Sequence, residues 1–408
     1  MRILYYFEDS VESTFGLLDI EILLPYFDKV VVFPNHNGHL NEYPAECEIA
    51  NDYLEWNRFH PFQIILSHLG DVLEALFSVR KEAGLSITKW KKYLQKITSN
   101  IFRANEIVRY TASKKYAFEN ISAYAFWFYD SFFLANLKKQ FPTITAVNRA
   151  HGGDIYEGQS TLAKFVLLRK MELKYLDRVV TVAKDGATYL QNRYPEFAHK
   201  ISYNYLGILG GDTINPFPQQ GFTIVTCSHV RDVKRVDKIA EVILNLDFPV
   251  TWYHIGNENK SEIVNDISVE RYWNVRDRLF SKSNLKFIPK GNCSREEIFQ
   301  FYETVPVNLF LSLSFTEGLP ISMVEAISFG IPILATDVGG CREIVNEETG
   351  VLVEVDMENE EIIKSIEHFR DSKWNKPEIR KGIKQFWAEN FDAEKNYKNM
   401  VKIIQGNG

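Results

Sequence analysis

Short apolar segments alternate with helical patterns through most of the 408 residues, and this alternation restricts the fold more than any other feature. In the first half these segments are residues 3–7, 30–33, 121–128, 144–148, 178–182 and 201–204. In the second half they are residues 223–227, 250–254, 285–288, 307–311, 333–335 and 350–353. Strands that alternate with helices predict parallel βαβ units, whose ligands bind at the carboxyl ends of the strands.

The two sets of strands are separated by residues 208–221, which are rich in Gly, Pro and Asn, as is typical of a linker. We therefore predict an α/β protein with two doubly wound, Rossmann-like domains and a cleft between them. The N-terminal domain would span residues 1–207 and the C-terminal domain residues 222–385. The last helical segment, residues 386–408, is expected to cross back to the first domain.

Composition and charge exclude several classes of protein. The chain is 45% hydrophobic and 25% charged, as globular proteins are, and its net charge of −6 does not favour nucleic acid. The four cysteines form no CxxC pair and have no nearby histidine at metal-ligand spacing, which predicts reduced thiols and no metal site. The start of the chain does not read as a signal peptide, and no apolar run is long enough to span a bilayer. These features predict a cytoplasmic protein.

A basic helical segment, residues 60–117, stands out within the first domain. From Arg80 to Lys115 there are ten Lys or Arg residues against two Glu residues. Ile87, Trp90, Leu94 and Ile97 would share one helical face, with lysines beside it. Two interpretations remain open: a peripheral contact of residues 80–115 with an anionic membrane, or a solvated helix whose apolar stripe packs on its own domain.

Residues 314–344 carry the most informative motif, SFTEGLPISMVEAISFGIPILATDVGGCREI. They follow an apolar strand, so Glu317 and Gly318 are expected in a loop at its carboxyl end. Pro320 suits the first position of a helix that runs to about residue 329. The start of that helix would present free N–H groups to a diphosphate, together with Leu319 and Ile321. Glu325, eight residues after Glu317, could accept hydrogen bonds from a ribose.

This segment resembles the signature of the large Glu-x7-Glu family of retaining glycosyltransferases with the GT-B fold (family 4, group 1), which includes bacterial polysaccharide and lipopolysaccharide enzymes. The resemblance implies that Glu317 is catalytic and positions the sugar or acceptor. A second match, CSHVRDVKRVD, is similar to the loop that binds the donor diphosphate. Lys234 takes the place of the family lysine, and either His229 or Arg231 the place of its second cation. We favour Arg231, since a guanidinium binds phosphate bidentately.

A third match, NRAHGGDIYEG, is similar to the family element whose histidine faces the donor sugar. It implies a catalytic role for His151. Asp154 is assigned to the acceptor side, or alternatively caps the following turn.

Weaker correspondences complete the expected site. Gly256, Pro289 and Lys290 lie in strand-end turns, where the donor base and ribose bind in the family. Ser13, Thr14 and Phe15 follow the first strand on the acceptor side, although the glycine-rich loop common there is absent.

The resemblance implies transfer of a hexosyl group from a UDP- or GDP-sugar to a glycan or lipid-linked acceptor during cell-surface polysaccharide synthesis. Neither a metal nor another cofactor is expected, because no Asp-x-Asp motif is visible. Two alternatives stay open: a sugar-nucleotide epimerase on the same fold, and a non-catalytic nucleotide-sugar-binding subunit.

Overall fold

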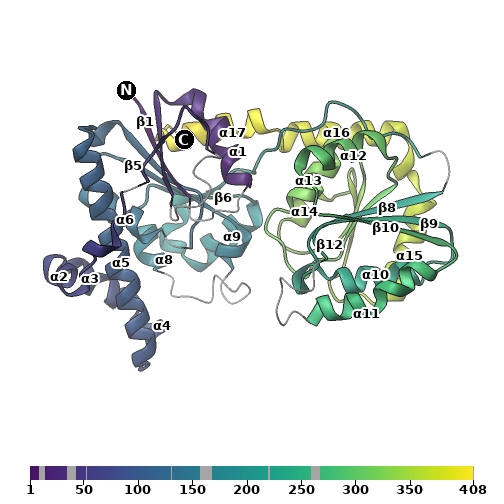
Figure 1. Ribbon diagram of the computed structural model, residues 1–408, viewed down its shortest axis with the longest axis horizontal. Helices are drawn as coiled ribbons and strands as arrows, with labels where there is room; N and C mark the ends of the chain where they lie inside the picture. The colour runs from purple at the N-terminus through teal and green to yellow at the C-terminus, as the bar shows by residue number, and fades with distance from the viewer. Residues whose placement is uncertain are drawn as a thin grey trace. The chain divides into compact units, whose positions relative to one another are not determined.

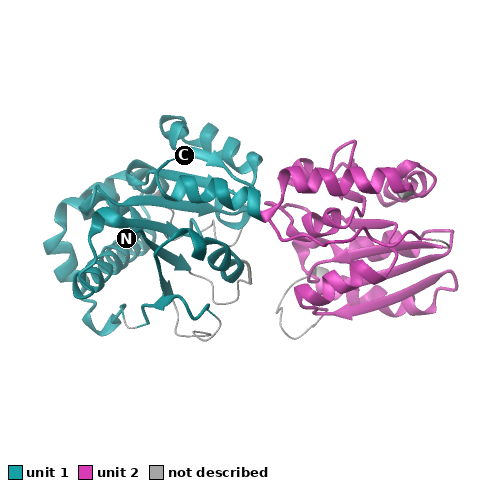
Figure 2. Ribbon diagram, turned by 90° about the horizontal axis from the view of Figure 1, so that it is seen from above, with its two compact units in different colours: residues 1–205, 394–408 teal, residues 206–393 magenta. Residues whose placement is uncertain are grey.

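The computed structural model describes residues 1–8, 14–34, 43–51, 53–129, 131–156, 168–218, 221–258 and 267–407. The chain divides into two compact units (Figure 2). Unit 1 comprises residues 1–205 and 394–408, and unit 2 comprises residues 206–393. The chain therefore passes between the units twice, at Tyr205–Leu206 and at Ala393–Glu394.

Unit 1 is built on a seven-stranded parallel sheet of order β3-β2-β1-β4-β5-β6-β7. Its strands are β1 (Ile3–Glu8), β2 (Lys29–Pro34), β3 (Glu48–Ile49), β4 (Ile121–Ala125), β5 (Thr145–Ala150), β6 (Arg178–Thr181) and β7 (Ile201–Tyr203). Its helices are α1 (Thr14–Leu23), α2 (Pro61–Ser67), α3 (Leu69–Ser78), α4 (Arg80–Ala83), α5 (Ile87–Ser113), α6 (Phe132–Gln140), α7 (Gly152–Ile155), α8 (Arg169–Tyr175), α9 (Lys184–Arg193) and α17 (Ala393–Ile404). Every residue of β1 is buried, as expected of a strand covered on both faces.

Unit 2 has a six-stranded parallel sheet of order β10-β9-β8-β11-β12-β13. Its strands are β8 (Phe222–Cys227), β9 (Val250–Ile255), β10 (Leu285–Gly291), β11 (Leu309–Ser312), β12 (Ile333–Thr336) and β13 (Gly350–Val353). Its helices are α10 (Val236–Leu244), α11 (Ile267–Ser281), α12 (Arg295–Thr304), α13 (Ile321–Ser328), α14 (Cys341–Ile344), α15 (Asn359–Arg370) and α16 (Pro377–Asn390). In both units the first strand lies beside the second and the fourth, as in a doubly wound Rossmann fold (Figure 1).

The predicted α/β fold with two parallel-sheet, Rossmann-like units is confirmed, but the borders of several elements differ. The sequence pattern of residues 20–27 predicts a helix there, whereas α1 begins at Thr14 and ends at Leu23. A short 3₁₀ turn, Leu24–Tyr26, follows and contains Pro25. Because proline has no N–H to donate, the α-helix cannot continue through it.

The C-terminal helix α17 is anchored in unit 1 by a buried polar cluster. Arg149 and Asp19 are fully buried and form an ion pair at 3.2 Å. The guanidinium of Arg149 lies over the ring of buried Tyr397, 5.6 Å from its centroid. The side-chain amide of Asn204 donates to the carbonyl of Asn396. These contacts tie α17 to α1, β5 and the end of β7.

The apolar stripe predicted on the basic helix is only partly realised. Ile97 is fully buried in α5, and Trp90 and Leu94 pack against the same core, so these residues follow the second interpretation. Ile87, at the start of the helix, is instead largely exposed. The stripe leaves the domain core because α5 extends beyond the helices that cover it. Within the described residues, no helix combines the length and the apolar character that a membrane crossing needs.

Candidate functional site

The candidate site lies where the strand order of the unit 2 sheet reverses. Strands β8 and β11 are neighbours, although β9 and β10 separate them in sequence. In doubly wound sheets, ligands bind at such a reversal, beside the loops that follow the carboxyl ends of the two neighbouring strands. The loop after β8 holds Lys234, and the loop after β11 holds Glu317.

The structure brings Lys234 and Glu317 together. The ammonium Nζ of Lys234 lies 2.5 Å from Oε1 of Glu317. Both loops are fixed by backbone contacts, since the N–H of Phe315 donates to the carbonyl of Val233 at 2.8 Å. Arg235 adds hydrogen bonds from its guanidinium to the carbonyls of Leu313 and Val355. The loops that carry Lys234 and Glu317 are thus fixed by contacts that do not involve the side chains of these two residues.

Gly339 allows the loop after β12 to pack on this site. Its φ of +49° is in the left-handed region, and an added Cβ would lie 1.9 Å from the carbonyl oxygen of Glu317. The N–H of Gly340 donates to the carbonyl of Gly318 at 2.9 Å. Only glycine fits such a close approach without strain. The Gly339-Gly340 pair therefore supports the turn that carries Glu317 and Gly318.

Helix α13 begins one residue later than predicted. Pro320 caps the helix and Ile321 is its first residue, because Pro320 has an extended ψ of 99°. The carbonyl of Pro320 accepts the N–H groups of Met323 and Val324. The N–H groups of Ile321 and Ser322 precede these bonds, so they have no intrahelical acceptor, as at any helix start. Leu319 is buried beneath this turn.

Glu325 is nearly buried one turn into α13 and faces Arg295, the first residue of α12. Its Oε1 lies 3.5 Å from Nε of Arg295. Burial raises the pKa of Glu325 to about 7, although Arg295 opposes the shift. No sequence motif indicated Arg295, because only the fold brings the start of α12 next to α13. Arg295 is the functional candidate that sequence reasoning missed.

The structure separates the two candidates for the second cation by their contacts. Nδ1 of His229 accepts a hydrogen bond from the N–H of Asn257 at 3.1 Å, which fixes the ring against the loop after β9. Arg231 is exposed and precedes the short 3₁₀ turn Asp232–Lys234. The guanidinium of Arg231 is accordingly accessible to an anion.

The residues predicted to bind base and ribose lie at the carboxyl ends of β9 and β10. Gly256 has a φ of +143°, and its N–H donates to the carbonyl of Gly291 at 2.8 Å. An added Cβ at Gly256 would lie 2.0 Å from the carbonyl oxygen of Ser228, so the packing of this turn already requires glycine. Pro289 and Lys290 are among the last three residues of β10, and Lys290 is exposed.

His151 lies in unit 1, directly after β5, and caps the short helix α7. Its Nε2 donates to the carbonyl of Phe126 at 2.9 Å, which leaves Nδ1 as the acceptor nitrogen. Burial, together with nearby Arg149, lowers the pKa of His151 to about 3. The imidazole is therefore neutral and fixed in one tautomer.

Asp154 is fully buried and serves the local backbone. Its Oδ1 accepts from the N–H of His151 and its Oδ2 from the N–H of Phe128, both at 2.7 Å. These contacts match the capping alternative and hold the backbone on both sides of His151. Burial raises the pKa of Asp154 to about 7, even though Arg169 opposes the shift.

The other acceptor-side predictions lie at the edge of the described chain. Ser13 is outside the described residues, and Thr14 and Phe15 form the first turn of α1. Among the described residues, no three His, Cys, Asp or Glu side chains are grouped as metal ligands.

In comparison with known proteins, the region that holds this site matches a family model. Residues 214–385 match the family model "Glycosyl transferases group 1". Two curated relatives are the O-antigen biosynthesis glycosyltransferase WbnH of Escherichia coli and an uncharacterized glycosyltransferase of Haemophilus influenzae. The first is 36% identical over 85 residues, which are 21% of this chain and 23% of WbnH. The second is 26% identical over 211 residues, which are 50% of this chain and 53% of the relative.

The match thus spans about half of these relatives or less. Over the whole chain, the fold is similar to that of Anabaena HepE in complex with UDP, with a TM-score of 0.69, 15% identity and 100% coverage of both chains. This likeness extends the GT-B architecture to both units. The segment that matches the family model, residues 214–385, includes the Lys234–Glu317 pair.

Proposed function

We propose that this protein is a retaining glycosyltransferase that moves a hexosyl group from a UDP- or GDP-sugar to a glycan or lipid-linked glycan. The observation that carries the proposal is the meeting of Lys234 and Glu317 beside the start of α13, at the strand-order reversal of unit 2. The relatives support the two halves of the reaction. WbnH, an O-antigen enzyme, suggests a cell-surface polysaccharide as acceptor, and the UDP complex of HepE suggests a uridine nucleotide as donor.

The donor diphosphate would bind between Lys234 and the N–H groups of Gly318, Leu319 and Ile321. A lysine and a helix N-terminus both stabilise anions, and together they neutralise the charge of the leaving group without a metal. Arg231 is our choice for the second cation, because it is exposed whereas the Nδ1 atom of His229 is already bonded to the backbone. Further contacts would come from Glu325 and Arg295 to the ribose, and from Gly256, Pro289 and Lys290 to the base.

The ion pair argues against Glu317 as a nucleophile. Oε1 of Glu317 lies 2.5 Å from Nζ of Lys234, so this oxygen is engaged by the ammonium and is not free to attack carbon. We therefore favour a front-face reaction, in which the acceptor hydroxyl oxygen bonds to the anomeric carbon as the bond from that carbon to the phosphate oxygen breaks. Both events take place on the same face of the sugar, so configuration is retained, and the hydroxyl proton passes to the leaving phosphate. Glu317 would position the sugar or the acceptor.

His151 remains a proposed sugar contact from unit 1. Since Nε2 donates to the carbonyl of Phe126, the ring would accept a hydrogen bond from a sugar hydroxyl at Nδ1. Asp154 would then act indirectly, as a positioning residue for the His151 backbone.

The test begins with a panel of UDP- and GDP-sugars in a thermal-shift assay, since a ligand that binds the folded state raises its apparent stability. With the donor identified, release of free nucleotide should require an acceptor. Altered donor sugar without nucleotide release would indicate the epimerase, and binding without turnover the non-catalytic subunit.

Lys234→Ala and Glu317→Ala should each lower turnover by about 100-fold or more, the usual effect of removing a group that stabilises the developing charge. Lys364→Ala, at an exposed lysine of α15 in the same unit, is the matched control and should keep full activity. Retained turnover in either site variant, with the fold intact, would remove that residue from the scheme.

We also propose that the reaction takes place in the cytoplasm, at the inner face of the cell membrane.

A further inference from the structure

Exposed apolar side chains are concentrated on one part of unit 1. Thirteen large hydrophobic side chains are exposed among the described residues, and seven of them fall between residues 62 and 87. Scattered exposed hydrophobics are normal on a protein surface, whereas a group of this kind marks an interaction site. Five of the seven lie on α2 and α3, which Figure 1 shows at the periphery of unit 1 beside α5. The other two, Leu85 and Ile87, lie just before α5 and at its first residue.

Helix α3 presents a continuous apolar stripe to solvent. Leu69, Leu73 and Phe77 are spaced by four residues and are 50%, 56% and 65% exposed. On α2, Phe62 and Leu66 have the same spacing and are 72% and 63% exposed. We call these five residues the apolar face. Its spacing puts each stripe on one side of its helix.

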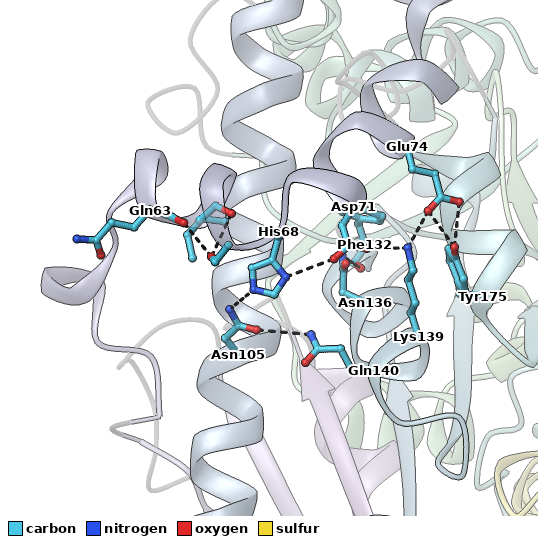
Figure 3. Close-up of polar contacts among 12 residues, drawn as sticks. Gln63, His68, Asp71, Glu74, Asn105, Phe132, Asn136, Lys139, Gln140 and Tyr175 are labelled. Atoms are coloured by element: carbon cyan, nitrogen blue, oxygen red, sulfur yellow. Dashed lines mark hydrogen bonds and ion pairs between the residues drawn. The ribbon is translucent and has the colours of Figure 1, made fainter.

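The buried side of α3 carries Val72 and Ala75, and the acidic residues of the helix bind neighbouring helices, as Figure 3 shows. Lys139 of α6 binds Asp71 at 2.6 Å and Glu74 at 2.7 Å, and Tyr175 of α8 donates to Glu74. His68, just before α3, bonds to Asn105 of α5. A surface helix normally turns its charged side outward and its apolar side inward. These contacts therefore fix α3 in the orientation that keeps Leu69, Leu73 and Phe77 in solvent.

Basic residues lie at one end of the apolar face and on the start of α5. Arg80 stacks on the ring of Phe77, with its guanidinium carbon 3.5 Å from the ring centroid. Lys89, Lys91 and Lys92 are exposed in the first turns of α5, next to exposed Leu85 and Ile87. Residues 61–96 carry six Lys or Arg against three Asp or Glu, although the whole chain has a net charge of −6. Two of those acids, Asp71 and Glu74, are already paired with Lys139.

We propose that the apolar face and these basic residues dock on the surface of an anionic lipid bilayer. Apolar side chains flanked by lysines fit the boundary between acyl chains and negatively charged headgroups. The surface differs from the stripe expected from sequence, because Trp90, Leu94 and Ile97 pack inward and the outward residues come mainly from α2 and α3. The inference rests on unit 1 alone and is independent of the donor site in unit 2.

The experiment is co-sedimentation of the full chain with vesicles of phosphatidylcholine alone or mixed with phosphatidylglycerol. Binding should require phosphatidylglycerol and weaken as salt rises. Lys91→Gln/Lys92→Gln should weaken it about tenfold or more, since each basic residue near a charged surface adds to binding. Phe62→Ser/Leu73→Ser should weaken it by a similar factor through the lost burial of apolar area.

Matched controls lie in unit 2. Lys364→Gln/Lys381→Gln removes two exposed lysines, and Leu209→Ser removes an exposed leucine. Both controls should bind vesicles as the unmodified protein does. Each variant is also compared by its thermal midpoint, so that a folding defect is recognised. Because Lys91 and Lys92 are exposed, their variant keeps the test valid if the apolar variant is unstable.

Three outcomes overturn the proposal. The first is no sedimentation with either vesicle, and the second is equal binding to both vesicles that the lysine variants do not change. The third is a concentration-dependent dimer that Phe62→Ser/Leu73→Ser abolishes while vesicle binding is absent, which would make the face a contact between copies of the chain. Weaker vesicle binding by both Lys91→Gln/Lys92→Gln and Phe62→Ser/Leu73→Ser, with unchanged binding by the two controls, supports the proposal.

Discussion

At the scale of single residues, the site depends on one glycine as much as on its charged groups. Gly339 touches the carbonyl of Glu317, so the position of the carboxylate follows from the absence of a side chain on another loop. A charged pair can be inferred from a motif, but a contact between two loops requires the fold.

We expect Gly339→Ala to abolish most donor binding while the two sheets remain folded. The new Cβ would lie 1.9 Å from the Glu317 carbonyl, so the turn must move away from Lys234. Gly221→Ala is the control, since Gly221 also has a positive φ, of +75°, but nothing lies within 4 Å of an added Cβ. Donor affinity by titration calorimetry separates the two. Equal losses in both variants would mean that backbone strain alone is responsible.

Glu325 gives a prediction for pH. Its pKa in the folded protein is about 7, above the ordinary value of 4.5, because burial disfavours the charged carboxylate. The folded state therefore binds the proton more tightly than the unfolded state, and Glu325 lowers stability progressively as the pH rises from about 4.5 to about 7. Glu325→Gln should raise the thermal midpoint more at pH 8 than at pH 5, relative to the unmodified protein. A gain that does not depend on pH would contradict this assignment.

At the scale of elements, the C-terminal helix α17 has the clearest consequence for stability. Tyr397 of α17 is buried against Arg149, so Tyr397→Ala should destabilise unit 1 by about 3–5 kcal/mol, the usual cost of truncating a buried aromatic side chain. Lys398→Ala, at the next position, removes an exposed pair with Glu394 and should change stability by less than about 1 kcal/mol. Denaturant unfolding measures both, and a similar small effect for the two variants would show that α17 is not anchored as described.

The sequence predicted the strands well and the orientation of helices poorly. Segments such as residues 3–7 and 333–335 are apolar throughout, as is typical of a parallel strand covered on both faces. The motif likewise indicated Lys234, Glu317 and the start of α13. By contrast, α3 has apolar residues on both of its sides, so its pattern could not tell which side meets the core. That choice is made by Lys139 and Tyr175, which are more than sixty residues away.

Two features were out of reach of sequence for the same reason. The pairing of Arg295 with Glu325 joins the starts of two helices. The edge strand β3, Glu48–Ile49, has only two residues and pairs with β2 without any apolar run of its own. Both depend on contacts between distant segments, which periodicity does not report.

At the scale of the whole molecule, each unit has its own sheet and core, so each should unfold in a separate transition. The proposed diphosphate and ribose contacts of the donor all lie in unit 2. A UDP or GDP nucleotide at about 100 times its Kd should therefore stabilise that unit by about 2.7 kcal/mol. Hydrogen exchange with the nucleotide present should slow in residues 227–235 and 314–328 more than in β1, β4 or β5 of unit 1. Equal protection of both units would contradict a donor site carried by unit 2.

The double passage of the chain has a practical result. The two connecting segments run beside each other, with the N–H of Ile208 bonded to the carbonyl of Phe391 and the N–H of Ala393 bonded to the carbonyl of Ile208. A protease that cuts once within residues 208–221 would leave both fragments associated, because α17 stays covalently attached to unit 2 while it packs against Arg149 and Asn204 of unit 1. Neither unit can be produced by dividing the gene at one point, since the first needs the last fifteen residues for its completion. In recombinant work, unit 1 would have to be made with residues 394–408 spliced directly after residue 205.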